Sequence, residues 1–357
     1  MKHSLLVLSF VLFLCAPASA QGTKSYVIGF YNLENLFDIY DDPVKNDEEF
    51  LPEGKNKWSE AKYQKKLQNM AKVIRNMKED NGLWHAVLGV SEIENRLVLE
   101  DLVTEPQIAE ANYQIIHYDG PDRRGVDVAL LYKPELFKYI ESESIPYTFE
   151  GSSIDFVMTK DQQEYFKTRD ILMVHGTIDG EHFAIYVAHL PSRAGDKKGS
   201  SQLRERGGEI MYSHAMKMQQ KYPGIKIVCM GDMNDNPTDA SMAGYLHGKE
   251  NIGDVTDTDF FSPFISMLKA GYGSLAYQGV WSIYDLVLVN NALANAPDGG
   301  LKISPLGKKG YYGRVYRKPY MTTQKGQYKG YPFRTFSNGS FIGGYSDHYP
   351  TFIVISK

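Results

Sequence analysis

The sequence predicts an α/β fold in which two β-sheets pack face to face with helices on their outer sides. Short runs rich in Val, Ile, Tyr and Phe recur along the whole chain and are typical of strands, several of them buried on both faces. Helical patterns lie between some of these runs. No Pro/Gly/Ser-rich linker, composition break or repeat interrupts the alternation, so we expect one domain over residues 21–357. A chain of this length is large for a single sheet, which favours two.

The individual elements follow from local patterns. In chain order the predicted strands are residues 26–31, 86–90, 126–132, 171–177, 183–189, 225–230, 283–289 and 351–356. The first helix is expected over 59–78, where apolar residues recur at spacings of three and four behind Ser59 as N-cap, and a second over 202–221. Asn338 and Gly339 predict a tight turn within a hairpin over 335–341.

Residues 1–20 have the layout of a cleavable secretory signal. Lys2 and His3 precede an apolar run over 5–14, and small residues follow at 18–20. The apolar run is about half the length that a bilayer span needs, so we expect no stable membrane insertion and a secreted or periplasmic protein that begins at Gln21. Cys229 would then be the one remaining cysteine. Its apolar surroundings predict a buried, inert thiol. Because one cysteine cannot form an internal disulfide, we expect the fold to rest on its hydrophobic core.

Charge is distributed unevenly along the chain. The formal net charge is −4, which argues against a general polyanion-coating protein. Residues 299–346, however, contain nine Lys or Arg and no Asp or Glu, with Tyr and Phe among them. This basic aromatic stretch is suited to gripping a phosphate backbone and stacking bases, with Arg314, Arg317 and Lys318 as candidate contacts. The alternative is a surface loop whose tyrosines pack on the fold and whose lysines are solvated.

Polar side chains stand at or just beyond the ends of several predicted strands. A sheet can deliver such residues from distant parts of the chain to one pocket, although each alone is more often a turn former or a structural group. Asn32 and Glu34 are two residues apart and would share a face if the first strand stays extended. The others are Glu92, His189, Asp232, Asn234, Asp285, Asp347 and His348.

These residue types indicate metal-assisted hydrolysis of a phosphate ester. Oxygen ligands without cysteine suit Mg²⁺ or Mn²⁺, and histidines beside them can carry protons or stabilise a phosphoryl group. A carboxylate at Asp285, inside an apolar run, would be costly to bury without a partner, and His348 is the natural candidate. The oxygen ligands available for such a cation are Asn32, Glu34, Glu92, Asp232 and Asp347.

Seven stretches carry a family resemblance. They are FYNLENLFD (30–38), LGVSEIEN (88–95), DRRGVDVALLY (122–132), HLPSR (189–193), GDMND (231–235), IYDLVLVN (283–290) and SDHYP (346–350). Together, and in this order, they are similar to the signature of the endonuclease/exonuclease/phosphatase superfamily, which includes pancreatic deoxyribonuclease and exonuclease III-type repair enzymes. The resemblance implies a four-layered α/β sandwich.

The resemblance also implies roles for individual residues. Glu92 matches the principal metal-binding glutamate, with Asn32 and Asp347 close to the metal and Glu34 as a helper. Asp232 matches the aspartate that orients or deprotonates the attacking water, and Asn234 its partner at the phosphate. His348 matches the histidine on the scissile phosphate, and Asp285 the acid that orients its ring.

Further groups are implied at the substrate. His189 matches a position held by histidine in the deoxyribonuclease branch, where a protonated ring could stabilise the transition state or donate to the leaving oxygen. Arg169, Ser192 and Arg193 are the remaining candidates for substrate binding, although Arg169 is also placed to pair with a neighbouring acid.

We therefore expect a monomeric, metal-dependent hydrolase of phosphate esters, with a secreted nuclease acting on DNA or RNA as the first choice. The alternatives are a secreted phosphatase and a phosphoesterase of the sphingomyelinase or inositol-phosphate type. A catalytically inactive binding module is a different class of protein, and the presence of every central group argues against it.

Overall fold

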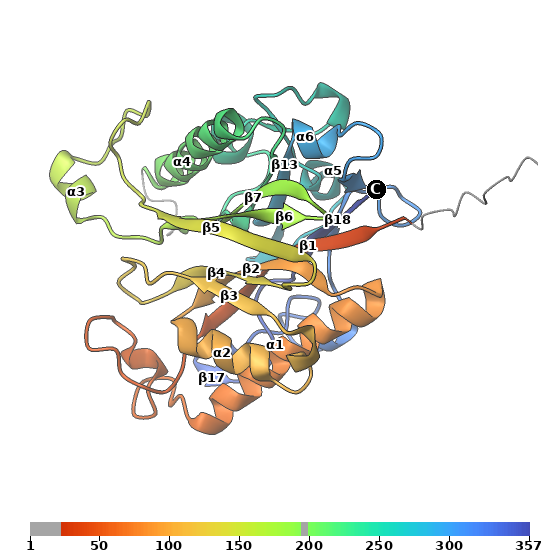
Figure 1. Cartoon of the computed structure of the whole chain (residues 1–357). Coiled ribbons are helices and arrows are strands. Elements are labelled where there is room, and N and C mark those ends of the chain that lie inside the picture. Colours follow the sequence, from red (N-terminus) through yellow and green to blue (C-terminus); the bar gives the residue numbers. More distant parts are fainter. Residues whose placement is uncertain (1–22, 194–198) are drawn as a thin grey trace, which may run out of the picture.

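A computed structural model describes residues 23–193 and 199–357, so the predicted signal over residues 1–20 lies outside the described part. Two seven-stranded sheets form the centre of the molecule (Figure 1). The first sheet has the order β14-β18-β1-β2-β4-β3, with β15 also paired to β18, and the second has the order β5-β6-β7-β8-β13-β10-β9. Within the described residues, no helix has the length and apolar composition needed to cross a membrane.

The strand bounds agree with most of the predicted runs. The first sheet contains β1 (Ser25–Leu36), β2 (His85–Ile93), β3 (Gln114–His117), β4 (Asp127–Tyr132), β14 (Lys302–Ser304), β15 (Gly313–Val315) and β18 (Thr351–Ser356). The second contains β5 (Phe137–Ile145), β6 (Ile171–Ile178), β7 (Glu181–His189), β8 (Lys226–Asp232), β9 (Gly248–Lys249), β10 (Phe260–Phe261) and β13 (Asp285–Asn290). Two hairpins stand apart, β11 (Leu275–Tyr277) with β12 (Val280–Ser282) and β16 (Phe336–Ser337) with β17 (Ser340–Phe341).

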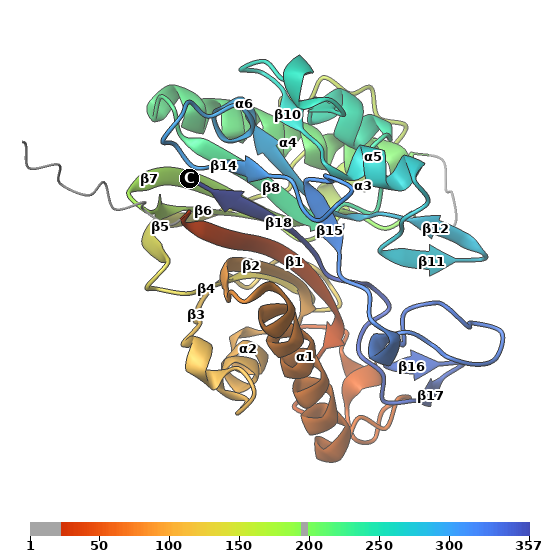
Figure 2. The same cartoon turned by 90° about the vertical axis from the view of Figure 1, so that its right-hand side faces the viewer.

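Helices cover the outer faces of both sheets and complete four layers, which confirms the predicted sandwich. Figures 1 and 2 show α1 (Glu60–Asn81) and α2 (Arg96–Thr104) against the first sheet and α4 (Ser200–Lys221) against the second. Shorter helices are α3 (Lys160–Tyr165), α5 (Phe264–Lys269) and α6 (Asn291–Ala294). Ser59 is the N-cap of α1 as expected, but its side chain makes no capping hydrogen bond.

The alternation of side chains along β1 explains why this strand is apolar on both faces. Ile28 and Phe30 belong to the core between the two sheets, whereas Val27 and Tyr31 belong to the core under α1 and α2. All four side chains are fully buried. The hydrophobic run at the start of the sequence is therefore the signature of a central strand in a layered fold.

The end of β1 departs from the extended conformation that we expected. Glu34 and Asn35 have φ values of 48° and 53°, and the pairing with β2 shifts register between Asn32 and Leu36. Asn32 and Glu34 consequently do not share a face, and the expectation based on a spacing of two is wrong here. The hairpin prediction is confirmed, because Asn338 and Gly339 take φ values of 49° and 75° between β16 and β17.

Candidate active site

The site lies where both sheets end on the same side of the molecule. β1 runs parallel to β2, and β7 runs parallel to β8, so the carboxyl ends of the strands in each pair meet. Asn32 links the two sheets. Its Nδ2 donates to Asp232 Oδ2 at 3.0 Å in the second sheet and to Glu92 Oε1 at 3.2 Å in the first.

Glu92 is held in place by the irregular end of β1. Its Oε2 accepts a hydrogen bond from the backbone N–H of Asn35 at 3.0 Å, and its own φ is 56°. A non-glycine residue in the left-handed region costs free energy, and such residues concentrate at functional sites. The bulge in β1 thus presents a backbone donor to the carboxylate that we predicted to be the principal metal ligand.

Strand register in the second sheet aligns three of the predicted groups. His189 in β7 and Asp285 in β13 are both register partners of Asp232 in β8, one on each side. His189 Nε2 lies 3.6 Å from Asp232 Oδ2 and 3.9 Å from Glu92 Oε1. Sequence positions that are far apart are therefore neighbours because the three strands end together.

The predicted Asp285–His348 pair is present. The Nδ1 of His348 lies 2.8 Å from Oδ2 of Asp285, whose side chain is fully buried. The other ring nitrogen, Nε2, is 3.8 Å from Asp232 Oδ2. Ser346 fixes this segment from the side, because it donates to the Asn32 carbonyl at 2.7 Å and accepts from the His348 N–H.

The local charges set the protonation of these groups. Burial alone would lower the pKa of His348, but the carboxylates of Asp285 and Asp232 outweigh it and raise that pKa well above its usual value. Burial raises the pKa of Asp232 to about 7, and the negative charges of Asp285 and Glu92 contribute while His348 opposes them. Asp232 is therefore an unusually basic carboxylate beside a protonated imidazole.

The role of His189 depends on whether its ring is protonated. Burial, followed by the positive charges of Arg169, Arg124 and His348, lowers its pKa well below the usual value. This holds although the carboxylates of Asp232 and Glu92 lie within 4 Å of Nε2. The ring is therefore neutral at neutral pH and can offer a lone pair.

The donor groups fit a divalent cation. Glu92, His189 and Asp232 each place one ligand atom within 4.8 Å of the others, and the same is true of Asp232, Asp285 and His348. The buried carboxylates that raise the pKa of Asp232 are also the arrangement that a bound cation stabilises. The ligand atoms of Glu92, His189 and Asp232 thus converge on one point, whereas Asn32, predicted as a metal ligand, turns its Nδ2 donor toward the two carboxylates and bonds through its oxygen to the Glu34 N–H.

Glu34 and Asp347 are engaged elsewhere. Glu34 is buried and accepts from Arg334 Nε at 3.2 Å and from the Thr335 N–H at 2.7 Å, while the buried Lys66 Nζ lies 3.8 Å away. Asp347 pairs with Arg334 at 2.9 Å. Neither side chain contacts Glu92 among the described residues, so both predicted metal positions belong to a charged network beside the cluster.

The arginines near β7 support the loops around the site. Arg169 is buried, pairs with Asp122 at 3.0 Å, and donates to the His189 and Leu190 carbonyls. Its alternative role as the partner of an acid is the one that the structure shows. Leu190 also accepts from Asn234 Nδ2 at 3.0 Å, and the Asn234 N–H donates to Asp232 Oδ1.

Arg193 joins the residues that follow β7 to the turn that follows β8. Arg193 bonds to the Asn234 carbonyl and to the carboxylates of Asp235 and Asp239. Ser192 is exposed and makes no side-chain hydrogen bond with a described residue. Arg193 therefore shapes the loop that carries Asn234.

The candidates from the basic stretch occupy three different environments. Arg314 stands on β15 over the ring of Phe352 at 5.9 Å, and Arg317 stacks on Trp281 at 4.9 Å and on Tyr349 at 5.6 Å. Lys318 pairs with Asp80 at 2.9 Å near the end of α1. Asp80 is fourteen residues beyond Lys66, or about 21 Å along the helix, so Lys318 is far from the charged network.

Two functional neighbours were not identified from the sequence. Lys66 belongs to the buried stripe of α1, where a lysine among apolar residues was a usable signal. Arg334 was seen only as one of many cations, because its pairing with Glu34 and Asp347 depends on the chain path between β15 and β18.

The four layers and the carboxylate and imidazole groups at their edge define a metal-dependent phosphoesterase. The chain matches the Endonuclease/Exonuclease/phosphatase family over residues 27–357 and belongs to it. It is accordingly a hydrolase that acts on phosphate ester bonds. No curated protein sequence matches the chain.

Several solved structures are similar to this chain, all at low sequence identity. A mannosyl-6-phosphatase of Bacteroides thetaiotaomicron has 14% identity and a TM-score of 0.54, with 92% of this chain and 99% of that chain covered. An endonuclease/exonuclease/phosphatase family protein of the same organism has 14% identity and a TM-score of 0.53, with coverage of 94% and 98%. TDP2 of D. rerio with a single-strand DNA product has 14% identity and a TM-score of 0.51, with coverage of 93% and 99%. At this identity the likeness concerns the fold.

Proposed function

We propose that the protein is a Mg²⁺- or Mn²⁺-dependent phosphomonoesterase that acts on small phosphate esters. The observation that carries the proposal is the meeting of Glu92, Asp232 and the Asp285–His348 pair at one end of both sheets. Glu92 would hold the cation, with the carboxylate of Asp232 beside it, and the cation neutralises charge on the phosphate when it is bound. A catalytically inactive scaffold would have no need for this complete set of groups.

Each group has a role that follows from its protonation. Asp232, whose Oδ2 lies near Nε2 of both His189 and His348, accepts a proton from the attacking water. The water oxygen then bonds to phosphorus, the ester P–O bond breaks, and the departing oxygen takes a proton from solvent. His348, kept protonated by Asp285, stabilises the negative charge on the phosphate oxygens. The neutral His189 accepts a hydrogen bond or contributes to the cation site.

Two cations of the basic stretch, Lys318 and Arg334, support a small substrate over a polynucleotide. Binding of a nucleic acid depends on cations that neutralise successive phosphates. Here Lys318 is paired with Asp80, and Arg334 is shared between Glu34 and Asp347. These two cations are satisfied within the protein, so they do not extend a track from the active site.

Metal dependence is the decisive test. We expect chelation to abolish phosphate release from glycerol 3-phosphate and added Mg²⁺ or Mn²⁺ to restore it. Glu92→Gln should weaken the metal's activating effect because a charge is lost while the shape is kept. Glu100→Gln, which alters an exposed carboxylate on α2, is the matched control and should behave as wild type. Full activity in thoroughly chelated protein would refute the mechanism.

A nuclease remains the second candidate, and Arg317 is the observation that favours it. Its exposed guanidinium stacks on Trp281 and on Tyr349, the residue that follows His348. A phosphodiester strand could pass over this surface. Cleavage of DNA or RNA that weakens steeply with salt, and in which Arg317→Ala raises the KM, would support this candidate over the phosphomonoesterase.

We also propose that the protein is exported and acts as a monomer. Export is supported by the pattern of Lys2, His3 and the apolar run over 5–14, which lies outside the described residues. Mature protein recovered outside the cytoplasm should begin at Gln21 by N-terminal sequencing. Light scattering should give the mass of one chain.

A further inference from the structure

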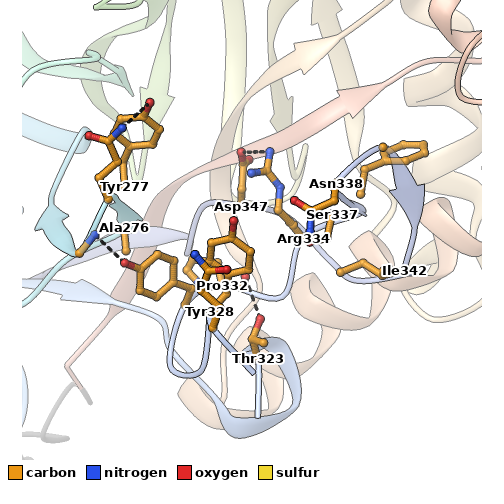
Figure 3. Close-up of a pocket in the computed structure, with 16 residues that line it drawn as sticks. Ala276, Tyr277, Thr323, Tyr328, Pro332, Arg334, Ser337, Asn338, Ile342 and Asp347 are labelled. Atoms are coloured by element: carbon orange, nitrogen blue, oxygen red, sulfur yellow. Dashed lines mark hydrogen bonds and ion pairs between the residues drawn. The ribbon is translucent and has the colours of Figure 1, made fainter. Parts of the chain in front are cut away.

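A cleft of about 640 Å³ opens beside the active site (Figure 3). The β11–β12 hairpin forms one side, the β16–β17 hairpin forms the other, and the segment from Thr323 to Arg334 closes it. Asp347 lines the cleft and directly precedes His348 in the chain. The cleft therefore adjoins the segment that carries His348.

The walls of the cleft are fixed by contacts that do not involve a ligand. The Gly279 N–H in one hairpin donates to the Tyr331 hydroxyl at 2.7 Å, which ties the closing segment to β11–β12. On the other side Phe336 packs on Trp58 with ring centroids 5.7 Å apart. A cleft held in shape before binding loses little conformational freedom when a ligand enters.

The charged groups of the cleft are already paired with each other. Among the described residues that line it, Arg334 and Asp347 are the charged ones, and they form an ion pair at 2.9 Å. Arg334 also bonds to Glu34 at 3.2 Å. A second phosphate or a carboxylate on the substrate would find no free cation in this lining, because the one guanidinium already serves two carboxylates.

The remaining lining suits a different chemistry. Aromatic faces are supplied by tyrosines, of which Tyr277 is 71% and Tyr328 40% exposed. Neutral donors and acceptors come from Gln278, Gln327 and Asn338. Aromatic faces bind the apolar face of a ring, and amides can both donate to and accept from hydroxyl groups.

We propose that this cleft binds an uncharged, hydroxyl-bearing ring, so that the substrate is a sugar phosphate, with the sugar either free or part of a nucleoside 5′-monophosphate. The inference rests on the proposed phosphomonoesterase function and names its substrate class. Tyr277 and Tyr328 stack on the ring, the amides select its hydroxyl groups, and the cleft meets the segment that carries His348 at Asp347.

The test compares hydrolysis of five kinds of substrate in the presence of Mg²⁺, measured as phosphate release from the monoesters and as strand cleavage on a gel for the oligonucleotide. Hexose 6-phosphates and a nucleoside 5′-monophosphate carry the ring, glycerol 3-phosphate lacks it, fructose 1,6-bisphosphate adds a second charge, and a DNA oligonucleotide is a diester. We expect kcat/KM to be highest for the ring-bearing monophosphates. A preference between the hexose and nucleoside substrates identifies which form of the sugar the cleft takes.

Variants separate recognition from chemistry. Replacement of both Tyr277 and Tyr328 with alanine should lower kcat/KM for the best ring substrate by about tenfold, mainly through KM, and leave glycerol 3-phosphate unaffected. Tyr165→Ala is the matched control, because Tyr165 is 69% exposed on α3 and does not line the cleft.

The outcomes that overturn the inference are distinct. Equal kcat/KM for glycerol 3-phosphate and the ring substrates, or equal losses on both in the double variant, would refute ring recognition and leave the phosphomonoesterase intact. Activity on the oligonucleotide alone, or on none of the substrates, would refute the proposed function itself.

Discussion

Asp232 lies next to most of the other polar groups of the site. It is buried next to the carboxylates of Glu92 and Asp285, which raise its pKa, and next to the imidazolium of His348, which lowers it. Asn32 donates to it from the other sheet. Burial is the largest cause of this raised pKa, and a cation bound beside Asp232 would lower it.

The Asp285–His348 pair gives the first prediction at this scale. Asp285→Asn should lower kcat on the order of 100-fold, because an amide can present a donor to Nδ1 and no longer stabilises the imidazolium. Combined with His348→Ala it should cost little more than His348→Ala alone. Steady-state kinetics of the three variants test this. Independent, additive losses would mean that the residues do not act as a pair.

His85 gives a prediction about pH. The ring is fully buried, and burial lowers its pKa to about 4. The unfolded chain, with a histidine pKa of about 6.5, therefore binds more protons between these values, and stability falls as pH drops through this window. The loss between pH 7 and pH 5 should be about 2 kcal/mol. His85→Leu should remove that part of the pH dependence in urea unfolding, and an unchanged slope would contradict the assignment.

At the scale of elements, α1 does more than cover the first sheet. Lys66 is buried and donates to the Thr335 hydroxyl at 2.6 Å and to the Tyr345 carbonyl at 2.7 Å. Asn69, one turn further on, donates to the carbonyls of Gly343 and Gly344. The helix therefore holds both ends of the segment that contains the β16–β17 hairpin, which is one wall of the cleft.

Lys66→Met should show how much these hydrogen bonds of Lys66 contribute to the free energy of unfolding. The substitution keeps the side-chain length but leaves Glu34 without its buried amine, and the free energy of unfolding should fall by about 3 kcal/mol. Lys65→Met, at an exposed position of the same turn, should change it by less than about 0.5 kcal/mol. Urea denaturation of both variants provides the comparison. Similar effects of the two would show that the buried contacts of Lys66 do not stabilise the fold.

The elements that could be predicted from the sequence are those with a hydrophobic signature. β1, β7, β8 and β18 are apolar runs because both faces are buried. β5 was not predicted, since its exposed residues include Lys138 and Glu143 and hide the alternation. The bulge at Glu34 could not be predicted, because glutamate has no preference for the left-handed region and the preference of asparagine for it does not single out Asn35.

At the scale of the whole molecule, the site depends on the distance between the two sheets. Gly89 in β2 faces Met230 in β8, and a Cβ added to Gly89 would lie 2.7 Å from Met230 Sδ and 3.2 Å from Phe30 Cδ2. The missing side chain thus allows the close approach that brings Asn32 within 3.0 Å of Asp232.

Gly89→Ala should therefore destabilise the protein by about 1–3 kcal/mol and reduce activity as well, because Met230 or the facing sheet must shift to admit the Cβ. Gly253→Ala is the control, since a Cβ there meets no atom within 4 Å. Thermal unfolding and phosphate release should be measured on both variants. Normal stability and activity in Gly89→Ala would show that Met230 can move aside without cost.

The residues of the candidate site could be predicted from the sequence, but their arrangement could be predicted only in part. Glu92, Asp232 and His348 stand at strand ends that the hydrophobic runs already mark. The placement of Glu34 and Asp347 with Arg334 follows from long-range packing of the segment before β18, for which a sequence pattern carries no signal.

The position of β18 inside the first sheet has a consequence for the time at which activity appears. Ser346 bonds to Asn32 across 314 residues, and β18 pairs with β1 directly after His348. Contacts of such sequence separation form late, and a chain emerging from the ribosome folds its N-terminal part first. We therefore expect a nascent chain to be inert, because the imidazole that faces the phosphate arrives only when the last strand closes the sheet.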